Sequence, residues 1–361
     1  MNNTKHRCFF ITGATGLVGG YLLDRLVRDR DAEIHVLVRA EDDAAARDRV
    51  KRLGQYFSIP DLAENVGIHV GKITEPGLGL PPTSLELLRT RVTDVVHVAA
   101  SISFTDTEAN QRVNCDGTAR LLDFIPGDAR FFYVSTAYVA GLAPRLGEDQ
   151  LDLGQGFRND YERSKFEAER FVRETFRGKE GLLTVLRPSI VTGEWRTGRT
   201  FQFMTVYRVL RALTAYARRH PRDPFSMEYT PDGTQNYIPV DRLTDMMVEI
   251  LRTPRCWGAT YHLVNDKPII NREFKVLIED RFGFPIINRA PDETSNNLNR
   301  AAVAGNAAYL AYLGGEPVFG CEARNSLLSA REPMPFDRDY LDRLLTFCDH
   351  SAWGRHLVIR R

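Results

Sequence analysis

The sequence lacks a long apolar run. A transmembrane helix needs about 18 or more consecutive apolar residues, and the most apolar stretch of this 361-residue chain, residues 92–104, is shorter and contains Asp94 and His97. We therefore expect no transmembrane segment. The first ten residues also lack the apolar core and small-residue cleavage site of a secretory signal, so we expect the protein to be cytoplasmic.

The sequence also has almost no net charge and no recognisable cysteine motif. The 48 Lys and Arg residues face 47 Asp and Glu residues, which leaves a formal charge of +1. This balance provides no overall field that would attract nucleic acid or an anionic membrane, so we expect a small-molecule substrate. The five cysteines form no CxxC pair and show no spacing that groups them with histidine as metal ligands. We expect reduced thiols, no metal ion, and a monomer or homodimer.

Short β-branched and aromatic runs alternate with segments of helical period through the first half of the chain. This alternation predicts an α/β fold, a Rossmann-type doubly wound parallel sheet with helices on both faces. Residues 1–188 are expected to form the nucleotide-binding domain, with its sheet completed by parts of 235–265, and residues 189–361 a smaller, mainly helical α/β substrate-binding region. Strands are predicted at 8–12, 34–39, 66–70, 94–99, 130–135, 182–187 and 260–264, and helices at 17–28, 116–125, 201–219, 241–251, 271–282 and 337–348.

A glycine-rich turn joins the first predicted strand to the first predicted helix. Gly13 can form the tight turn, Gly16 lets the backbone approach a pyrophosphate, and Gly19 allows close packing of helix against strand. The helix N-terminus adds free N–H groups and a positive dipole. The alternative is an ordinary glycine-rich turn, but its position at the first strand–helix junction favours dinucleotide binding.

Arg39 closes the second predicted strand, where an NAD-dependent enzyme usually has an acid for the ribose 2′-hydroxyl. A guanidinium matches a phosphate bidentately, so Arg39 predicts NADPH, with Arg47 or Lys51 on the next helix as further charges. NADH stays possible, because Arg39 can also be a solvated strand end.

Three polar residues predict proton-transfer chemistry. Tyr161 and Lys165 lie four residues apart on a predicted helix behind the cap candidates Asn159 and Asp160, and so share one face. A nearby ammonium group lowers the pKa of a phenol and makes it a usable acid or base. Thr136 ends the fifth strand, where the topology delivers side chains to the cofactor crevice, and can bond the substrate oxygen. The alternative is three unrelated surface polar residues.

These segments resemble the extended short-chain dehydrogenase/reductase family over about residues 7–270. Its glycine turn, strand-five segment, YxxSK motif and Arg-Pro-Ser segment match residues 12–19, 136–141, 161–165 and 187–189. The resemblance implies that Thr136, Tyr161 and Lys165 are catalytic, that Thr136 and Tyr161 also contact substrate, and that Lys165 binds the nicotinamide ribose. It further implies cofactor contacts from Gly13, Thr15, Gly16, Leu17, Val18, Gly19, Arg39, Ile73, Ala99, Ala100, Ser101, Asn114, Ser135, Lys165, Pro188, Ser189 and Ile190.

Within that family the chain is most similar to the thioester-reductase and fatty acyl reductase branch. Members carry Leu-Val-Arg-Ala after strand two, here residues 37–40, and a Gly-Asp-Ile/Leu segment after strand three, here residues 71–73. This chain has Lys72 where the branch usually has an aspartate that accepts from the adenine amino group. Lysine has no acceptor atom, so we expect adenine to be bound differently.

The resemblance implies hydride transfer from NADPH to a carbonyl, with an acyl thioester on CoA or on an acyl carrier protein as the expected substrate. Phe201, Phe203 and Met204 are expected to contact it, although the 201–213 segment suits a buried helix equally well. Arginines 208, 211, 218 and 219 are candidates for carrier docking or a solvated face. Open alternatives are a ketone or imine reductase, an NAD-dependent sugar-nucleotide epimerase or dehydratase, a hydroxysteroid-type dehydrogenase and a non-catalytic NADP sensor.

Overall fold

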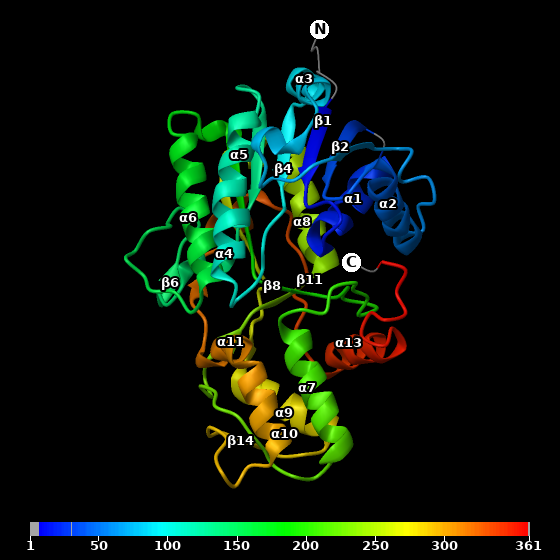
Figure 1. The fold of residues 1–361 in the computed structure, drawn as a ribbon. Helices are drawn as coiled ribbons and strands as arrows, with labels where there is room; N and C mark the ends of the chain where they lie inside the picture. Colours follow the sequence, from blue (N-terminus) through cyan, green and yellow to red (C-terminus); the bar gives the residue numbers. More distant parts are fainter. Residues whose placement is uncertain (1–6, 30, 360–361) are drawn as a thin grey trace.

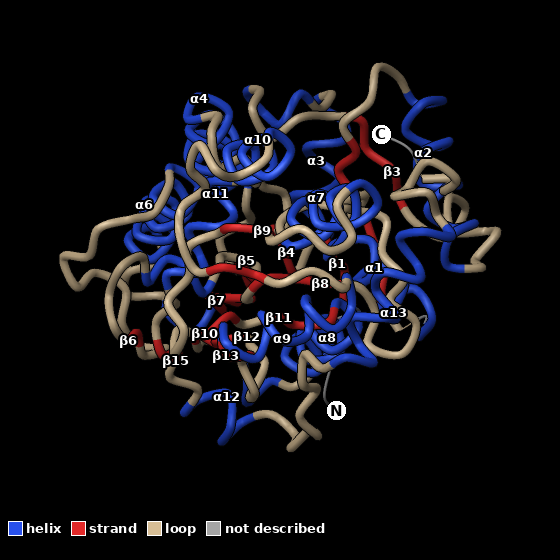
Figure 2. Tube along the Cα trace, turned by 90° about the horizontal axis from the view of Figure 1, so that it is seen from below, coloured by secondary structure: helices blue, strands red, loops and turns tan. Residues whose placement is uncertain are grey.

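A parallel sheet of seven strands forms the centre of the larger part of the molecule. A computed structural model describes residues 7–29 and 31–359; residues 1–6, which begin the segment that was examined for a secretory signal, lie outside this range. The strands lie in the order β12-β7-β5-β4-β1-β2-β3, in the middle of the view in Figure 2 with helices around them. The predicted Rossmann-type fold class is confirmed. The bounds are β1 Arg7–Thr12, β2 Ala32–Val38, β3 Gly67–Val70, β4 Asp94–His97, β5 Arg130–Val134, β7 Leu183–Pro188 and β12 Thr260–Leu263.

The side chains of β1 show how the sheet divides the core. Phe9 and Ile11 belong to one buried cluster, with side chains of α1 (Leu17–Asp29), α2 (Asp43–Phe57) and α8 (Val240–Arg252). Cys8 and Phe10 belong to another, with side chains of α3 (Pro82–Arg91), α5 (Gly117–Phe124) and α6 (Asp160–Thr175). Successive residues of a strand point to opposite faces, so this alternation places helices on both sides of the sheet.

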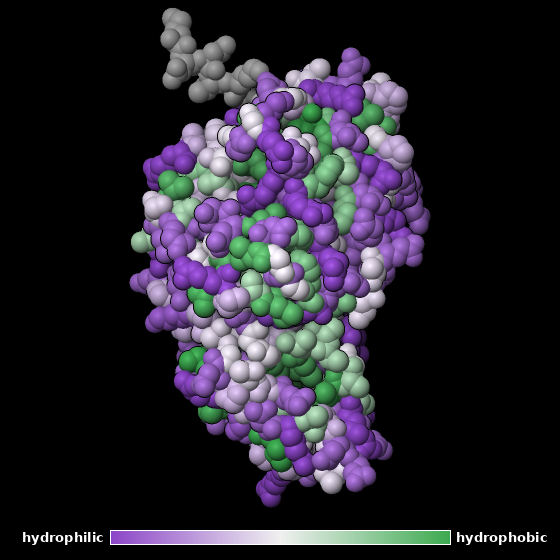
Figure 3. Space-filling view, turned by 90° about the vertical axis from the view of Figure 1, so that its left-hand side faces the viewer, coloured by the Kyte–Doolittle hydropathy of each residue, from purple (hydrophilic) through white to green (hydrophobic). Residues whose placement is uncertain are grey.

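A smaller part of the molecule, built from chain segments before and after β12, has its own buried cluster. It lies below the sheet in Figure 1, and the surface narrows between the two parts in Figure 3, where apolar side chains gather near the middle of the face. Its main helices are α7 (Val206–Arg219), α9 (Asn271–Phe282), α10 (Asn297–Gly305), α11 (Ala307–Leu310) and α13 (Arg338–His350). The short strands pair as β8 (Ile190–Thr192) with β11 (Tyr237–Pro239), β9 (Phe225–Ser226) with β14 (Ile286–Ile287), β10 (Thr234–Gln235) with β13 (Ile269–Ile270), and β6 (Arg145–Leu146) with β15 (Val318–Phe319). Two further short α-helices are α4 (Thr107–Asn110) and α12 (Glu322–Leu327).

The predicted helix at 201–219 is wrong at its start. Helix α7 begins at Val206, because Thr205 has a φ of +50°, outside the right-handed helical region. The helix predicted at 116–125 is likewise shorter, since α5 begins at Gly117 and follows a π-helical stretch, Gln111–Asp116. Over the described ranges, 7–29 and 31–359, no helix has the length and apolar character needed to cross a bilayer.

Candidate active site

The glycine turn after β1 packs tightly against the end of β4. Gly13 has a φ of +73°, and a Cβ added there would lie 2.5 Å from the Ala99 nitrogen. A Cβ on Gly19 would lie 2.2 Å from the Gly13 carbonyl oxygen. The Gly16 N–H donates to that same oxygen at 2.9 Å and closes the turn. Helix α1 therefore begins at the turn with its N-terminus available to an anionic group.

A cavity of about 390 Å³ runs from this turn across the carboxyl ends of the strands into the smaller part. The order of strands reverses between β1 and β4, and ligands of open α/β sheets bind at such a switch point. The cavity is lined by most of the predicted site residues: Gly13, Thr15, Gly16, Leu17, Val18, Gly19, Arg39, Ile73, Ala99, Ala100, Ser135, Thr136, Tyr161, Lys165, Pro188, Ser189, Ile190 and Met204.

Three cationic side chains line the end of the cavity near β2 and β3: Arg39, Arg49 and Lys72. Arg49 was not among the predicted residues; it lines the cavity, whereas Arg47 and Lys51, which were considered as further charges, are not among its lining residues. The Arg49 guanidinium donates to the Arg39 carbonyl oxygen, whereas Arg47 donates to the Ala63 carbonyl oxygen at 3.0 Å. Lys51 lies 4.0 Å from Glu64. The cationic groups, the glycine turn and the helix N-terminus together fit a phosphorylated dinucleotide.

Lys165 lies on α6, whose N-terminus is capped by the Asn159 side chain accepting from the Glu162 N–H at 3.0 Å. The Lys165 ammonium donates to the Val134 carbonyl oxygen at 2.8 Å and lies 4.4 Å from the centroid of the Tyr133 ring. Burial lowers the pKa of Lys165 to about 8, and the carboxylate of Glu169 acts in the opposite direction. The ammonium is thus held at the end of β5, inside the cavity.

The Tyr161 hydroxyl is protonated at neutral pH. Burial raises the pKa of Tyr161 to about 12, while a hydrogen bond with the Thr136 hydroxyl lowers it. Thr136 caps the 3₁₀ turn Ala137–Ala140, accepting from the Tyr138 N–H at 3.3 Å. The two residues lie far apart in the sequence, and the fold brings their hydroxyls together. The pKa of Tyr161 is thus raised overall, the Lys165 ammonium that was expected to lower it is not among the causes of the shift, and the hydrogen bond with Thr136 only opposes the effect of burial.

A buried carboxylate behind the cavity wall, Glu169, was not singled out from the sequence. It accepts from the guanidinium of Arg187 at 2.6 Å and from the Ser135 hydroxyl at 2.6 Å, and it pairs with Arg173 at 2.8 Å. These partners hold the pKa of Glu169 near 2 despite burial. Glu169 therefore joins α6 to the ends of β5 and β7, which carry the cavity-lining residues.

Asn114 and Ser101 lie behind the cavity wall, although both were expected to contact the cofactor. The Asn114 carboxamide accepts from the Ser101 N–H at 2.8 Å and donates to the Ser101 carbonyl oxygen at 3.0 Å. It also donates to the Ser164 hydroxyl at 2.9 Å. Asn114 thus fixes the loop after β4 to α6, and the neighbouring residues Ala100 and Ile102 face the cavity instead.

Two of the three apolar residues predicted to contact substrate do not line the cavity. Phe201 packs against Tyr21, Tyr56 and Phe57 of the first two helices, and Phe203 packs against Tyr207 and Trp353. Because α7 starts five residues later than predicted, these rings point away from the cavity into the two cores. Met204 does line it.

Other aromatic rings, gathered around Tyr161, do line the cavity. Phe104, in the loop after β4, has its ring centroid 5.8 Å from that of Tyr161 and 4.8 Å from that of Tyr309. Tyr312 lies 5.6 Å from Phe104 and 5.1 Å from Tyr138. All five rings line the cavity. Tyr138 was recognisable two residues after Thr136, but Tyr309 and Tyr312 reach the site only through tertiary packing.

Comparison with known proteins decides the family. A family model described as "Male sterility protein", a model of an NAD-binding domain, matches residues 11–247. The chain belongs to this family. It therefore carries the NAD-binding domain of this family, and the resemblance to the extended short-chain dehydrogenases and their thioester-reductase branch is confirmed.

Among curated relatives, an isonitrile lipopeptide synthase of Streptomyces coeruleorubidus is 33% identical over 76% of this chain and 19% of its own length. The large subunit of L-2-aminoadipate reductase of Eremothecium gossypii is 26% identical over 84% of this chain and 23% of its own. This chain thus spans about a quarter or less of these relatives. The crystal structure of the terminal R domain from the myxalamid PKS-NRPS pathway has a TM-score of 0.82 at 24% identity, covering 97% of this chain and 92% of that one.

Proposed function

We propose that this protein uses NADPH to reduce an acyl thioester, carried on CoA or on an acyl carrier protein, to an aldehyde or alcohol. Similarity to the aminoadipate reductase and lipopeptide synthase supports this substrate class, as does the fold shared with a thiolation-reductase di-domain at a TM-score of 0.73 and 17% identity, covering 97% of this chain and 76% of that one. The observation that carries the proposal is the meeting of Tyr161, Thr136 and Lys165 in one cavity with the glycine turn.

The cofactor preference rests on charge. Arg39 and Arg49 line the cavity next to the end of β2, and guanidinium groups there suit the 2′-phosphate that distinguishes NADPH from NADH. The remaining cofactor contacts are assigned to the cavity-lining residues of the glycine turn, of β5 and of the Pro188–Ile190 segment. Lys165 is assigned to the nicotinamide ribose. Residues 1–188, with parts of 235–265, would hold the cofactor, and residues 189–361 the acyl group, in a cytoplasmic protein.

NADPH, when bound, supplies the hydride that reduces the carbonyl carbon. Tyr161, protonated at neutral pH, donates its proton to the carbonyl oxygen, and Thr136 orients both oxygens through its hydroxyl. Addition of hydride and proton across the thioester carbonyl gives a hemithioacetal. Its C–S bond then breaks, and aldehyde and free thiol leave. Reduction of the aldehyde to the alcohol would take a second hydride from a second NADPH, with Tyr161, reprotonated from solvent, again donating the proton.

Carrier docking is assigned to the exposed face of α7. Arg208, Arg211, Arg218 and Arg219 lie on this face, and the Arg208 guanidinium lies 5.2 Å from the ring centroid of Tyr309, which lines the cavity. A row of cationic groups that ends at the cavity suits the acidic surface of a carrier protein.

The test is NADPH oxidation with a panel of acyl-CoA and acyl-pantetheine thioesters, ketones and imines, with products identified by mass. We expect thioesters to yield aldehyde or alcohol. Tyr161→Phe should lower kcat by about 10²- to 10⁴-fold while the Kd for NADPH stays unchanged, and Tyr229→Phe, outside the cavity, should be neutral. Full activity in Tyr161→Phe would refute the assigned acid. Reduction of ketones or imines alone would instead identify a tailoring reductase, and tightly retained NAD an epimerase.

A further inference from the structure

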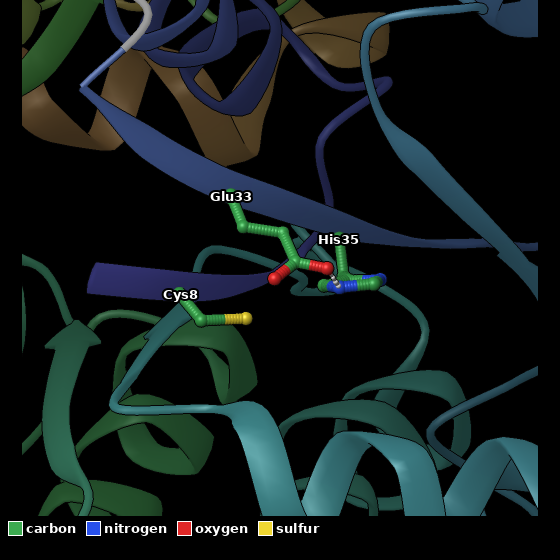
Figure 4. A group of neighbouring side chains, drawn as sticks. All are labelled: Cys8, Glu33 and His35. Carbon is green, nitrogen blue, oxygen red and sulfur yellow. Dashed lines mark hydrogen bonds and ion pairs between the residues drawn. The ribbon is translucent and has the colours of Figure 1, made fainter. Parts of the chain in front are cut away.

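A cluster of potential metal ligands lies at the opposite ends of the strands from the candidate active site. The side chains of Cys8 on β1 and of Glu33 and His35 on β2 converge near the amino ends of these strands (Figure 4). The thiol sulfur, a carboxylate oxygen and a ring nitrogen all lie within 4.8 Å of one another. His69, on the neighbouring β3, contacts His35. We call these four residues the Cys8 cluster.

The register of the sheet brings the cluster together. Cys8 is paired with Glu33 across β1 and β2, His35 with Gly67, and Leu37 with His69 across β2 and β3. Paired residues of parallel strands, and residues two apart on one strand, point to the same face, so all four side chains share one face. A Cβ on Gly67 would lie 2.3 Å from His35 Nδ1. The absence of a side chain at residue 67 therefore leaves the space that the His35 ring fills.

The contacts of His35 give one ring nitrogen a supporting hydrogen bond with His69 and turn the other toward the carboxylate of Glu33. The Nδ1 atom of His35 lies 2.9 Å from Nε2 of His69, and its Nε2 lies 2.9 Å from a carboxylate oxygen of Glu33. Histidine ligands commonly use their second ring nitrogen in a hydrogen bond that fixes the tautomer and the ring orientation. Because the Nδ1 atom of His35 is bonded to His69, its Nε2 atom points toward the carboxylate of Glu33 and the thiol of Cys8. The Arg91 guanidinium, 3.0 Å from Glu33, holds the carboxylate in turn.

We propose that Cys8, Glu33 and His35 bind a zinc-class divalent cation, with a water molecule as the fourth ligand and His69 supporting His35. Thiolate, imidazole and carboxylate are the ligand types that zinc combines in tetrahedral sites. Cys8 and His35 are buried, at 3% and 6% exposure, whereas the Glu33 side chain is 35% exposed. Glu33 therefore opens the site to solvent and gives the ion a path of entry, and thiolate and carboxylate together neutralise its charge.

The bound ion would connect β1 to β2 at the edge of the sheet away from the cavity. Its effect is therefore on the stability of the folded chain, since a ligand that binds only the folded state stabilises it. The proposal does not depend on the proposed reductase function, and the two can fail separately.

The experiment is titration of the full chain with Co²⁺ after removal of metals by a chelator, under a phosphine reductant. We expect one equivalent to bind, with the visible bands of tetrahedral cobalt and a near-ultraviolet thiolate-to-cobalt charge-transfer band, both displaced by Zn²⁺. Zn²⁺ should also raise the Tm. Cys8→Ser should abolish the charge-transfer band, and Cys115→Ser, a thiol remote from the cluster, should keep it. His69→Gln should keep the band with affinity lowered about 10- to 100-fold.

Glu33→Gln provides a second test in case Cys8→Ser fails to fold, because residue 33 is partly exposed and its substitution should leave the fold intact. It should retain the far-ultraviolet spectrum of the parent and bind Co²⁺ more weakly. Absence of saturable binding to the parent, or an identical cobalt spectrum and affinity in both Cys8→Ser and Glu33→Gln, would overturn the proposal. In that case the cluster is a hydrogen-bonded Glu–His–His network. NADPH binding, measured on the same samples, should be the same with and without metal.

Discussion

Replacing Glu169 by Gln tests the buried charge network behind the cavity. Glu169 and Arg187 are both fully buried and joined at 2.6 Å, and among the described side chains Glu169 is the carboxylate that pairs with Arg187. Removing one partner of a buried ion pair typically costs about 3–5 kcal/mol, because the other charge stays buried without compensation. The pKa of Glu169 leads to a similar value. Its fall from 4.5 to about 2 on folding corresponds to about 3 kcal/mol of stability.

We therefore expect Glu169→Gln to lower the free energy of unfolding at pH 7 by about 3 kcal/mol, measured by urea denaturation with circular dichroism. A carboxylate whose pKa is lowered on folding contributes stability above its unfolded pKa and loses it as the pH falls through the folded pKa. The difference between parent and variant should thus be constant above about pH 5.5 and narrow below about pH 4.5. The parent alone should lose this stability on acidification.

Glu167→Gln is the matched control, because Glu167 lies two residues away on the same helix and pairs with Arg170 at the surface, at 40% and 59% exposure. A surface pair of this kind contributes under about 1 kcal/mol. If Glu169→Gln cost no more than Glu167→Gln, or if its effect did not narrow in acid, the assignment of Glu169 as a buried ionised carboxylate would be wrong.

Three further substitutions test the cavity. Arg39→Ala should raise KM for NADPH about 10- to 100-fold and leave KM for NADH nearly unchanged, since a charged hydrogen bond contributes about 1.5–3 kcal/mol; equal effects on both would refute the phosphate contact. Gly19→Ala should abolish cofactor binding, measured by fluorescence titration, because the new Cβ would lie 2.2 Å from the Gly13 carbonyl oxygen. The control variant Gly181→Ala should bind the cofactor normally, because no atom lies within 4 Å of the new Cβ. Phe201→Ala should lower the free energy of unfolding by about 3–5 kcal/mol and leave the order of preference among acyl thioesters unchanged. A changed order of preference would show that Phe201 contacts the substrate.

The residues that follow strands were predictable from the sequence. Gly13, Arg39, Thr136 and Ser189 each come directly after a buried run or close it, and parallel strands all end at one edge of the sheet. Their spacing along the chain therefore maps onto one crevice without knowledge of packing. The helix that carries Tyr161 and Lys165 was equally accessible, because a four-residue spacing fixes a shared helical face.

The structure places Phe201 and Phe203 away from the predicted site, because the direction in which their side chains point depends on a single backbone turn. The apolar residues at 201–213 have the period of a helix, but the positive φ of Thr205 delays its start, and the rings of Phe201 and Phe203 enter the cores. Conversely, Tyr309 and Tyr312 reach the cavity from a short segment near the end of the chain. Nothing in their local sequence distinguishes a ring that faces a cavity from one that covers a core.

The Cys8 cluster could not be predicted from the spacing of its residues in the sequence. Metal motifs are recognised when two ligands share a turn or a helix, and the sequence separates Cys8, Glu33 and His69 by whole elements. Only Glu33 and His35 are near neighbours, and within a strand that spacing indicates nothing more than a common face. The pairing of Cys8 with Glu33 and of His35 with Gly67 supplies the missing information. Because β1 and β2 carry the cavity at one end and this cluster at the other, a metal there would act on the stability of the strands, and the reaction at the far edge would proceed without it.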